Sequence, residues 1–412
     1  MSEKRILLKN CEKIAPDNID TYLKQGGFKA LKKAREKMSP KEVIEAIKTS
    51  GLRGRGGAGF PCGSKWELAK KSKGAKKFLI CNADEGEVGT FKDRYVLQHD
   101  PFSVIEGMAI AAYAIGAKKG YIYLRGEYHY LLEGLKKAIT QTKKKGFLKG
   151  LDIEIEEGAG SYICGEESAL MNSIEGKRGE ARFRPPFPPT SGLFEKPTII
   201  NNVETLMNVP HIILKGARWY NKLGTGESKG TKLFSVSGDV ARPGVYEMEL
   251  GCSLKELVED LAGAKEVKMV QIGGSTGGIV PGSMIDTALS YETVLGSGAV
   301  TVFDETRDVI DFVYRTVEFL NEESCGKCTP CREGTEVMVE VLGRLARGEG
   351  VQTDIRTLEE LSETMMLSSM CGLGQGVPIP VLDTLKYFRN DYENRINQSV
   401  FLRSLKTVGS GR

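Results

Sequence analysis

The sequence has few histidines, no long apolar run and almost no net charge. Its three histidines, His99, His129 and His211, stand at none of the spacings of a hydrolytic triad or a His-rich metal site, which argues against those two chemistries. The longest apolar stretch, Gly107–Ala117, has 11 residues, whereas a membrane-spanning helix needs about 20. The 58 Lys and Arg against 54 Asp and Glu leave a net charge of +4, too small over this length to indicate a nucleic-acid partner.

What the chain has in excess is glycine, together with a set of cysteines near its C-terminal end. There are 49 glycines among 412 residues, well above the usual ~7%, and no collagen-like period accounts for them. The nine cysteines are an odd number, which favours a reducing compartment and a metal site over a disulfide framework. Hydrophobic residues make up 40%, so the chain is globular, and its length predicts two or three domains.

The first part of the chain, residues 1–228, is predicted to form an α/β domain after a helical N-terminal segment. Strand-like stretches occur at Phe78–Cys81, Tyr121–Leu124 and Leu151–Ile155, and the helical stretch Ser103–Ile115 separates the first two. Strands that alternate with helices are typical of a layered domain with a largely parallel sheet.

Two further domains are predicted after a Gly/Ser/Lys-rich linker. Residues 229–305 begin with a β-hairpin, Leu233–Val236 and Val245–Leu250, which a short helix follows at Ser253–Leu261. Residues 306–412 carry apolar side chains at helical spacing in four segments, the last of which starts near Val381. Short connections between such helices favour an antiparallel bundle.

The cysteines give the strongest chemical signal. Cys325, Cys328 and Cys331 follow one another at two-residue spacing, and Cys371 lies forty residues further on. Three thiols on one tight loop can bind three corners of an iron–sulfur cube, and a distant fourth completes it. Four thiolates also satisfy Zn²⁺. Structural zinc sites normally use two separated pairs, so the spacing favours a [4Fe–4S] cluster over zinc.

Two glycine-rich segments are candidate ligand loops. The first, Gly51–Gly63, has enough glycine for backbone N–H groups to converge on an anion, but a surface loop without a ligand fits it as well. The second, Gly158–Glu167, follows a strand and opens a helix, which suits a cofactor phosphate or ring edge. Glu166 and Glu167 could equally do no more than complement the helix dipole there.

An acidic turn lies between these two loops. Asp84, Glu85 and Glu87 follow the strand that ends near Cys81, and open α/β sheets bind ligands at the carboxyl ends of their strands. Carboxylates this dense repel an unshielded phosphate, so we expect them to face sugar hydroxyls, a ring or an amide. The alternative is a solvated acidic turn without a ligand.

The order of these motifs resembles that of one family. The chain contains, in sequence, GLRGRGGAGFPCGSKW, CNADEGEVGTFKDR, GAGSYICGEESALMNSIEGKRGEARFRPPFPP, INNVET, ESCGKCTPCREGT and MCGLGQG. Together they are similar to the NADH-binding flavoprotein subunit of respiratory complex I, called the F-type subunit in bacteria. The resemblance runs from about Asn18 to Tyr392.

The resemblance implies a fold and a set of cofactor contacts. The fold would be a Rossmann-like domain for FMN and NADH, then a small β-grasp-like domain, then a four-helix bundle that carries the cluster. Glu87, the predicted catalytic residue, would bind the nicotinamide end of NADH. No side chain would need to act as an acid or a base in the hydride transfer. Position 68 is Leu, where some members of the family carry an aromatic residue that would help to hold the adenine. The implied FMN or NADH contacts are Gly54, Arg55, Gly56, Gly57, Ala58, Gly59, Phe60, Lys65, Asn82, Asp84, Glu85, Glu87, Tyr162, Gly165, Glu166, Glu167, Phe187, Asn201 and Asn202.

The chemistry of these side chains fits such ligands. Phe60 and Phe187 offer flat faces for rings, and Lys65 supplies a cation for the flavin phosphate. Glu87 and Glu167 can accept hydrogen bonds from a carboxamide or a ribose, and they would repel a 2′-phosphate, which favours NADH over NADPH.

The resemblance also implies the reaction and the partners. NADH would deliver a hydride to FMN, and single electrons would pass to the cluster at Cys325, Cys328, Cys331 and Cys371 and on toward quinone. The partners would be the small, thioredoxin-like [2Fe–2S] subunit and the large iron–sulfur subunit of complex I, in a cytoplasmic arm peripheral to the inner membrane. A diaphorase subunit of an NAD-linked hydrogenase or formate dehydrogenase shares these motifs. A non-catalytic zinc- or cluster-bearing scaffold is the alternative from another class, against which the intact CNADEGE and GEE segments argue.

Overall fold

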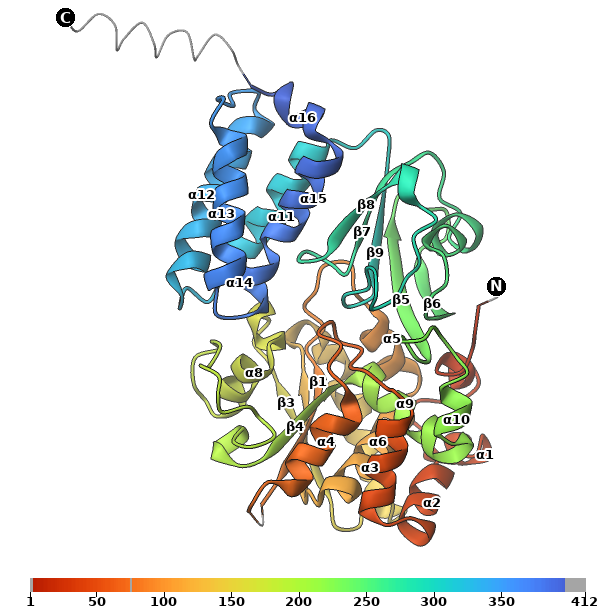
Figure 1. Ribbon diagram of the computed structural model, residues 1–412. Coiled ribbons are helices and arrows are strands. Elements are labelled where there is room, and N and C mark those ends of the chain that lie inside the picture. Colours follow the sequence, from red (N-terminus) through yellow and green to blue (C-terminus); the bar gives the residue numbers. More distant parts are fainter. Residues whose placement is uncertain (1–2, 75, 397–412) are drawn as a thin grey trace, which may run out of the picture.

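The computed structural model describes residues 3–74 and 76–396 and contains two sheets and a helical C-terminal region (Figure 1). The first sheet and its helices form the lower part of Figure 1, and the second sheet and the C-terminal helices lie above it. The last part of the predicted 306–412 domain, residues 397–412, lies outside the described residues.

The first sheet has four parallel strands in the order β3-β2-β1-β4. In its central strand, Leu79 and Cys81 belong to one hydrophobic core, whereas Phe78 and Ile80 belong to another. Both faces are therefore covered, as a parallel sheet requires. The predicted α/β fold with a parallel sheet is confirmed. Its strands are β1 (Phe78–Ala83), β2 (Lys119–Leu124), β3 (Asp152–Glu157) and β4 (Thr198–Asn202).

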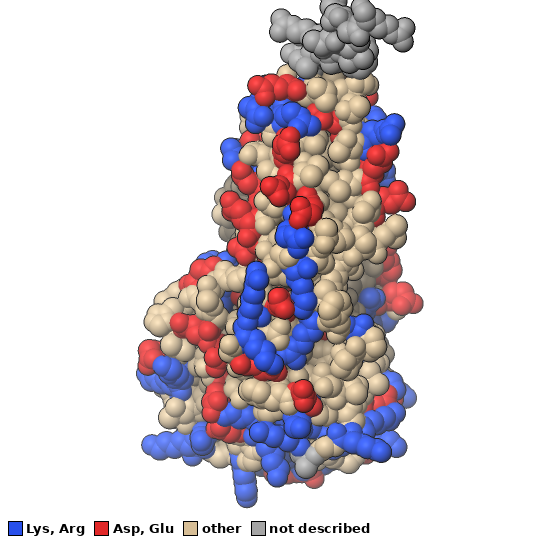
Figure 2. All heavy atoms as spheres, turned by 90° about the vertical axis from the view of Figure 1, so that its left-hand side faces the viewer, with Lys and Arg blue, Asp and Glu red and all other residues tan. Residues whose placement is uncertain are grey.

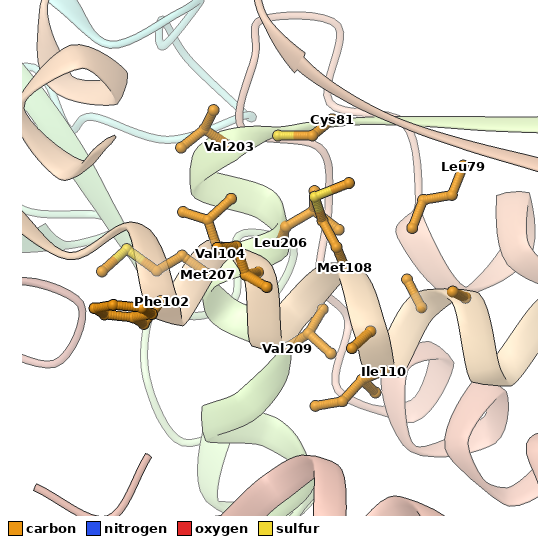
Figure 3. Close-up of a cluster of buried hydrophobic side chains, with 14 of the residues drawn as sticks. Leu79, Cys81, Phe102, Val104, Met108, Ile110, Val203, Leu206, Met207 and Val209 are labelled. Atoms are coloured by element: carbon orange, nitrogen blue, oxygen red, sulfur yellow. The ribbon is translucent and has the colours of Figure 1, made fainter. Parts of the chain in front are cut away.

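Two helices, α6 (Pro101–Ile115) and α9 (Val203–Lys215), pack against one face of this sheet (Figure 3). They approach each other so closely that a Cβ added to Gly107 would lie 2.1 Å from the backbone oxygen of Leu206. Because α6 is mostly apolar and nearly all of its residues are buried, it is the central helix of this core. The other helices of this part are α1 (Ile19–Lys24), α2 (Lys29–Lys37), α3 (Pro40–Thr49), α4 (Cys62–Lys71), α5 (Lys92–His99), α7 (Leu132–Lys144), α8 (Glu167–Ile174) and α10 (Ala217–Tyr220).

The second sheet is mixed and has the order β6-β5-β9-β7-β8. Strands β5 and β9 pair in parallel, and the other neighbours are antiparallel. The hairpin expected after residue 229 is present, and most of the helix expected at Ser253–Leu261 is a π-helix, Glu256–Leu261. The strands are β5 (Thr231–Gly238), β6 (Gly244–Glu249), β7 (Val267–Ile272), β8 (Gly278–Pro281) and β9 (Ala299–Asp304).

The predicted helical C-terminal region is confirmed. Its last long helix begins at Pro378 rather than near Val381, because proline is well suited to the first turn of a helix, where its missing N–H costs nothing. No helix within the described ranges is both long and apolar enough to cross a membrane. The helices are α11 (Val309–Glu322), α12 (Thr329–Ala346), α13 (Asp354–Ser368), α14 (Gly372–Gly376), α15 (Pro378–Tyr387) and α16 (Arg389–Glu393).

Charge is unevenly distributed over the face that Figure 2 shows. In Figure 2 the end of the molecule away from the C-terminal helices is dominated by Lys and Arg, whereas both signs are interspersed over the helical end. Surfaces on which both signs alternate suit a protein contact better than a nucleic-acid contact, which needs one basic face.

Candidate functional site

A cavity of about 570 Å³ lies at the carboxyl ends of β1 and β4, where an open parallel sheet binds its ligands. It is lined by residues of both glycine-rich segments, of the acidic turn and of the INNVET motif. The structure therefore brings together four motifs that are far apart in the sequence. The predicted site residues that line the cavity are Gly56, Gly57, Ala58, Asn82, Asp84, Glu85, Glu87, Tyr162, Gly165, Glu166 and Asn202.

Backbone rather than side chains forms the wall of the cavity at the first glycine loop. A Cβ added to Gly56 would lie 3.1 Å from the Cβ of Asn202, and Gly57 has a φ of +124°, which L side chains rarely adopt. These glycines let the chain approach a ligand closely. The structure thus favours a ligand loop over an empty surface loop.

Each carboxylate of the acidic turn has a different environment. Glu85 accepts hydrogen bonds from the amides of Asp93 and Arg94 at 2.8 and 2.9 Å, and so holds the first turn of α5. Glu87 accepts one bond from the Tyr162 hydroxyl at 2.7 Å and another from a backbone amide at 2.6 Å. Burial raises the pKa of both carboxyls to about 7. The turn is therefore not the solvated loop that was the alternative.

Asp84 is the member of the turn that has no partner for one oxygen. Its Oδ2 is buried and makes no hydrogen bond to any residue that the structure describes, and burial raises the pKa of this carboxyl to about 7. A buried acceptor without a donor is costly. A ligand that donates a hydrogen bond at this point, such as a sugar hydroxyl or a ring N–H, would remove that cost.

A buried ionic network extends from the wall of the cavity, which Lys92 and Asp93 line, into the protein. The Lys92 ammonium is 2.7 Å from an oxygen of Asp93 and 3.0 Å from Glu204, and Lys232 is 2.7 Å from the same Glu204 oxygen. All four side chains are almost fully buried. Asp93 also accepts a bond from the side-chain amide of Asn202 at 2.5 Å. The network thus fixes a residue of the cavity wall.

A second group of predicted residues lies outside the cavity and is more exposed. Lys65 pairs with Glu167 at 3.1 Å, and its ammonium is 5.9 Å from the centre of the Phe60 ring. The Phe60 and Phe187 side chains are 48% and 56% exposed. Lys65, Glu167 and Phe60 therefore offer a cation, a carboxylate and an open ring face next to one another.

Two other predicted residues, Asn201 and Arg55, form hydrogen bonds within the protein and do not line the cavity. Asn201 accepts a bond from the indole N–H of Trp66 at 2.8 Å, so it faces α4 and not the cavity. Arg55 is fully buried and donates to the hydroxyls of Tyr220 and Tyr291, both at 3.0 Å. The predicted residues that do not line the cavity are Gly54, Arg55, Gly59, Phe60, Lys65, Glu167, Phe187 and Asn201.

Glu166 has both of the roles that the sequence left open. Its carboxylate accepts hydrogen bonds from the amides of Ser168 and Ala169 at 3.0 and 2.9 Å, so it caps the N-terminus of α8. It also lines the cavity. Complementing the helix and bordering a ligand site are therefore compatible here.

The four cysteines of the predicted cluster lie together beside this cavity. Cys328 precedes α12, Cys331 lies in its first turn, and Cys371 directly precedes α14. Burial raises the pKa of the Cys331 thiol to about 11, and the neighbouring sulfurs of Cys328, Cys371 and Cys325 raise it as well. Gly372, which follows Cys371, and other residues of α14 line the cavity. The thiols and the cavity therefore share one short helix.

These residues fit FMN and a cube-shaped cluster. The glycine wall and the orphaned Asp84 oxygen suit a polar ring system with hydroxyls. Among residues 3–74 and 76–396, no group of three or more His, Cys, Asp or Glu side chains is placed to hold a single metal ion. A cube needs wider spacing than one ion does, because each thiolate binds a different iron.

Several residues of the cavity gave no clear signal in the sequence. Lys92 and Asp93 belong to the CNADEGEVGTFKDR motif, but the motif did not indicate what these two side chains contact. The segment from the second sheet was distinguished by the glycine density of GGSTGG alone. The missed residues that line the cavity are Gly86, Thr90, Lys92, Asp93, Ile163, Gly273, Thr276, Gly277, Gly296, Ser297, Gly372, Leu373, Gln375, Gly376 and Ile379.

Comparisons with known proteins agree with this geometry. Residues 47–211 match the family of the Nuo51 FMN-binding domain, and residues 311–395 match the NADH-ubiquinone oxidoreductase-F iron-sulfur binding region. These two matches contain the cavity motifs and the four cysteines. They support FMN, NADH and a [4Fe–4S] cluster as the cofactors.

Full-length relatives come from two kinds of enzyme. The chain is 43% identical to an F-type subunit of NADH-quinone oxidoreductase (number 2) of Rhizobium meliloti, over 95% of this chain and 98% of that one. It is 44% identical to the NADP-reducing hydrogenase subunit HndC of Solidesulfovibrio fructosivorans, over 95% and 84%. A crystal structure of an NAD⁺-reducing [NiFe]-hydrogenase in the H2-reduced state superposes with a TM-score of 0.88 at 38% identity, covering 100% of this chain and 72% of that one. The chain therefore belongs to the family of F-type subunits of NADH-quinone oxidoreductase, and it is an NADH-oxidising subunit that binds FMN and a [4Fe–4S] cluster.

Proposed function

We propose that the chain is the electron-input subunit of a complex I-type enzyme, in which electrons from NADH leave through the cluster toward quinone. The observation that carries this proposal is the continuity of one cavity from the acidic turn to α14, the helix that directly follows Cys371. A flavin held there lies next to a cluster ligand. Electron transfer between them then needs no movement of the chain.

We assign the cavity to FMN and the nicotinamide end of NADH, and the exposed group beside it to the rest of the dinucleotide. Gly56, Asp84 and Asn202 would hold the flavin by close backbone approach and by side-chain hydrogen bonds. Glu167 would bind a polar part of the dinucleotide, and Phe60 would contact a ring. Lys65, which pairs with Glu167 at 3.1 Å, would supply the cation for the flavin phosphate. The Leu68 side chain is 51% exposed on α4, so it can offer an apolar surface there but no aromatic face.

The protein's part in the reaction is orientation and the exclusion of water. When bound, the flavin supplies the chemistry that accepts a hydride and releases single electrons. Glu87 would bind the nicotinamide end by accepting hydrogen bonds, for which its ionised form is needed. No general acid or base is required, in agreement with three histidines that do not line the cavity.

Two further features of the predicted fold are proposals. The strand order of the second sheet, with an antiparallel first pair and a parallel central pair, supports a β-grasp-like domain over residues 229–305. The helices α11, α12, α13 and α15 pack into a shared core and support a four-helix bundle after residue 306. We place the first domain boundary at residue 228.

We propose that the partners are the small, thioredoxin-like [2Fe–2S] subunit and the large iron–sulfur subunit of the peripheral arm. The naming of relatives as one subunit of an NADH-quinone oxidoreductase, such as that of Rhizobium meliloti, supports a multisubunit assembly. Met366 and Leu367, at the C-terminal end of α13 and close in sequence to Cys371, are 43% and 81% exposed. Apolar side chains in this place suit a protein partner that receives electrons.

A hydrogenase-linked diaphorase is the second candidate. It is favoured by the identity to a hydrogenase subunit over 95% of this chain and by the TM-score of 0.88 to an NAD⁺-reducing hydrogenase. Purification of the chain from its native host, with identification of the accompanying subunits, separates the two. Quinone-reductase subunits would support our proposal, and a [NiFe] or [FeFe] hydrogenase subunit would refute it.

A further inference from the structure

A loop of the second sheet reaches into the cavity. It is the turn between β7 and β8, residues 273–277, which we call the 273–277 loop. Gly273 packs against the backbone of Gly296, since an added Cβ would lie 3.0 Å from the Gly296 Cα. The Ser297 hydroxyl donates to the Gly273 carbonyl at 3.1 Å and is 3.1 Å from the Thr90 hydroxyl. The loop is therefore fixed to the segment that follows the acidic turn.

The 273–277 loop holds one oxygen of Glu87. The backbone amide of Ser275 donates to Oε1 of Glu87 at 2.6 Å, while the Tyr162 hydroxyl donates to Oε2 at 2.7 Å. Both carboxylate oxygens thus have a donor from the protein, and the Ser275 side chain and the Val88 amide hydrogen-bond to this carboxylate as well. Two donors from different parts of the fold fix both the position and the rotation of this carboxylate.

Contact between the loop and Glu87 requires glycine at position 274. The φ of Gly274 is +87°, and a Cβ added there would lie 2.0 Å from the Cγ of Glu87. No side chain fits into this space. The Glu87 side chain therefore packs directly on the loop backbone.

The loop also contacts the helix beside the cluster. A Cβ added to Gly376 of α14 would lie 2.7 Å from the Cβ of Thr276, and the Thr276 hydroxyl is a hydrogen-bond partner of Tyr162. The loop therefore lies between the carboxylate that we assign to NADH and the helix that follows Cys371.

We propose that the 273–277 loop is a positioning element for dinucleotide binding, which orients the Glu87 carboxylate toward the nicotinamide end of NADH through the Ser275 amide. This inference rests on the proposed role of Glu87. It makes the second sheet a part of the NADH site, although that sheet lies outside both matched family regions.

The test is Gly274→Ala in the full chain with FMN bound. The added methyl displaces Glu87 from the Ser275 amide, and losing a hydrogen bond to a charged group weakens binding roughly tenfold. We expect the Kd of NAD⁺, measured by calorimetry, and the KM for NADH with ferricyanide to rise by that factor, with FMN content and kcat unchanged. The matched control is Gly244→Ala on β6, where the nearest atom to the new methyl is 3.8 Å away.

A double variant tests whether the loop acts through Glu87. If it does, the double variant binds NAD⁺ as weakly as Glu87→Gln alone. If the two residues act independently, the double variant binds NAD⁺ more weakly than either single variant, by the product of their two effects. If Gly274→Ala does not retain FMN, Ser275→Pro removes the same amide donor without a methyl at position 274. Because it also removes the Ser275 hydroxyl, which hydrogen-bonds to Glu87, it is compared with Ser275→Ala, and the loss of affinity beyond that of Ser275→Ala is expected to be roughly tenfold.

The outcomes separate this inference from the proposed function. Unchanged NAD⁺ affinity in an FMN-loaded loop variant, or an additive loss in the double variant, overturns the loop's role while Glu87→Gln still weakens binding. If Glu87→Gln itself leaves NAD⁺ affinity unchanged, the role of Glu87 is wrong and the loop proposal falls with it.

Discussion

Replacing Lys92 with Met tests whether the ionic network supports the cavity. The Lys92 side chain is 1% exposed and lies between Asp93, at 2.7 Å, and Glu204, at 3.0 Å. Burial lowers the pKa of Lys92, but the carboxylates of Asp93 and Glu204 raise it, and the net result is a pKa above the ordinary value of 10.5. A raised pKa of a base contributes stability that is fully present below 10.5 and therefore at pH 7.

Methionine fills the space of the lysine stem but leaves two buried carboxylates with less compensation. Breaking a buried ion pair by removing one partner costs about 3–5 kcal/mol. The matched control is Lys77→Met, since Lys77 is also buried but donates only to the backbone oxygens of Ala69 and Lys70, at 2.6 and 2.7 Å. Removing these hydrogen bonds should lower the free energy of unfolding by only about 1–3 kcal/mol.

Urea unfolding at pH 7 measures both variants. Tryptophan fluorescence reports on this part of the chain, because the buried Trp66 indole bonds to Asn201 beside the cavity wall and the other tryptophan, Trp219, lies in α10. The loss in free energy of unfolding caused by Lys92→Met should become smaller as the pH falls from 8 to 5. The reason is that a carboxylate left without its cation binds a proton more readily in the folded state than in the unfolded state. A loss no larger than that of Lys77→Met, or a deficit independent of pH, would refute the reasoning.

Two further predictions concern the cofactors. For Glu87→Gln we expect weaker NADH binding with FMN retained. Burial raises the pKa of Glu87 to about 7, so the affinity of the wild-type chain for NADH should fall as the pH drops through 7. The variant should lose the part of this pH dependence that is due to Glu87. A titration from pH 6 to 8 checks this, and identical pH profiles would remove Glu87 from the NADH site. For Cys371→Ala we expect the cluster to be lost while NADH–ferricyanide activity remains, since hydride transfer precedes the cluster. An intact EPR signal of the cluster would contradict the assignment of the fourth ligand.

The strands and the cluster cysteines could be predicted because their signals are local. The apolar run at Phe78–Cys81 is buried, and the spacing of Cys325, Cys328 and Cys331 limits the thiols to the segment before α12 and the first turn of that helix. The distant Cys371 could be included because three thiols on one loop need a fourth from elsewhere to complete a cube.

The roles of individual carboxylates could not be predicted from the same segment. Glu85 and Glu87 are two residues apart in one acidic turn, yet one holds α5 and the other meets Tyr162 and Ser275. Which role each has depends on which amide lies opposite, and that is a property of the packed fold. Glu87 and Ser275 are 188 residues apart in the sequence, so no local pattern could indicate their contact.

The buried lysines were missed for a similar reason. Lysine is almost always exposed, so Lys92 and Lys232 gave no sign of a core position. Only the convergence of α5, α9 and β5 on Glu204 shows that their charges are compensated.

The central claim is that one chain holds the flavin and the cluster side by side, so that electrons pass between them within the molecule. Rapid mixing of the anaerobic, fully loaded chain with NADH, followed by freeze-quench EPR at several protein concentrations, tests this most directly. We predict that cluster reduction follows flavin bleaching at a rate independent of protein concentration. A rate proportional to protein concentration, or a bleached flavin with the cluster still oxidised, would contradict the claim.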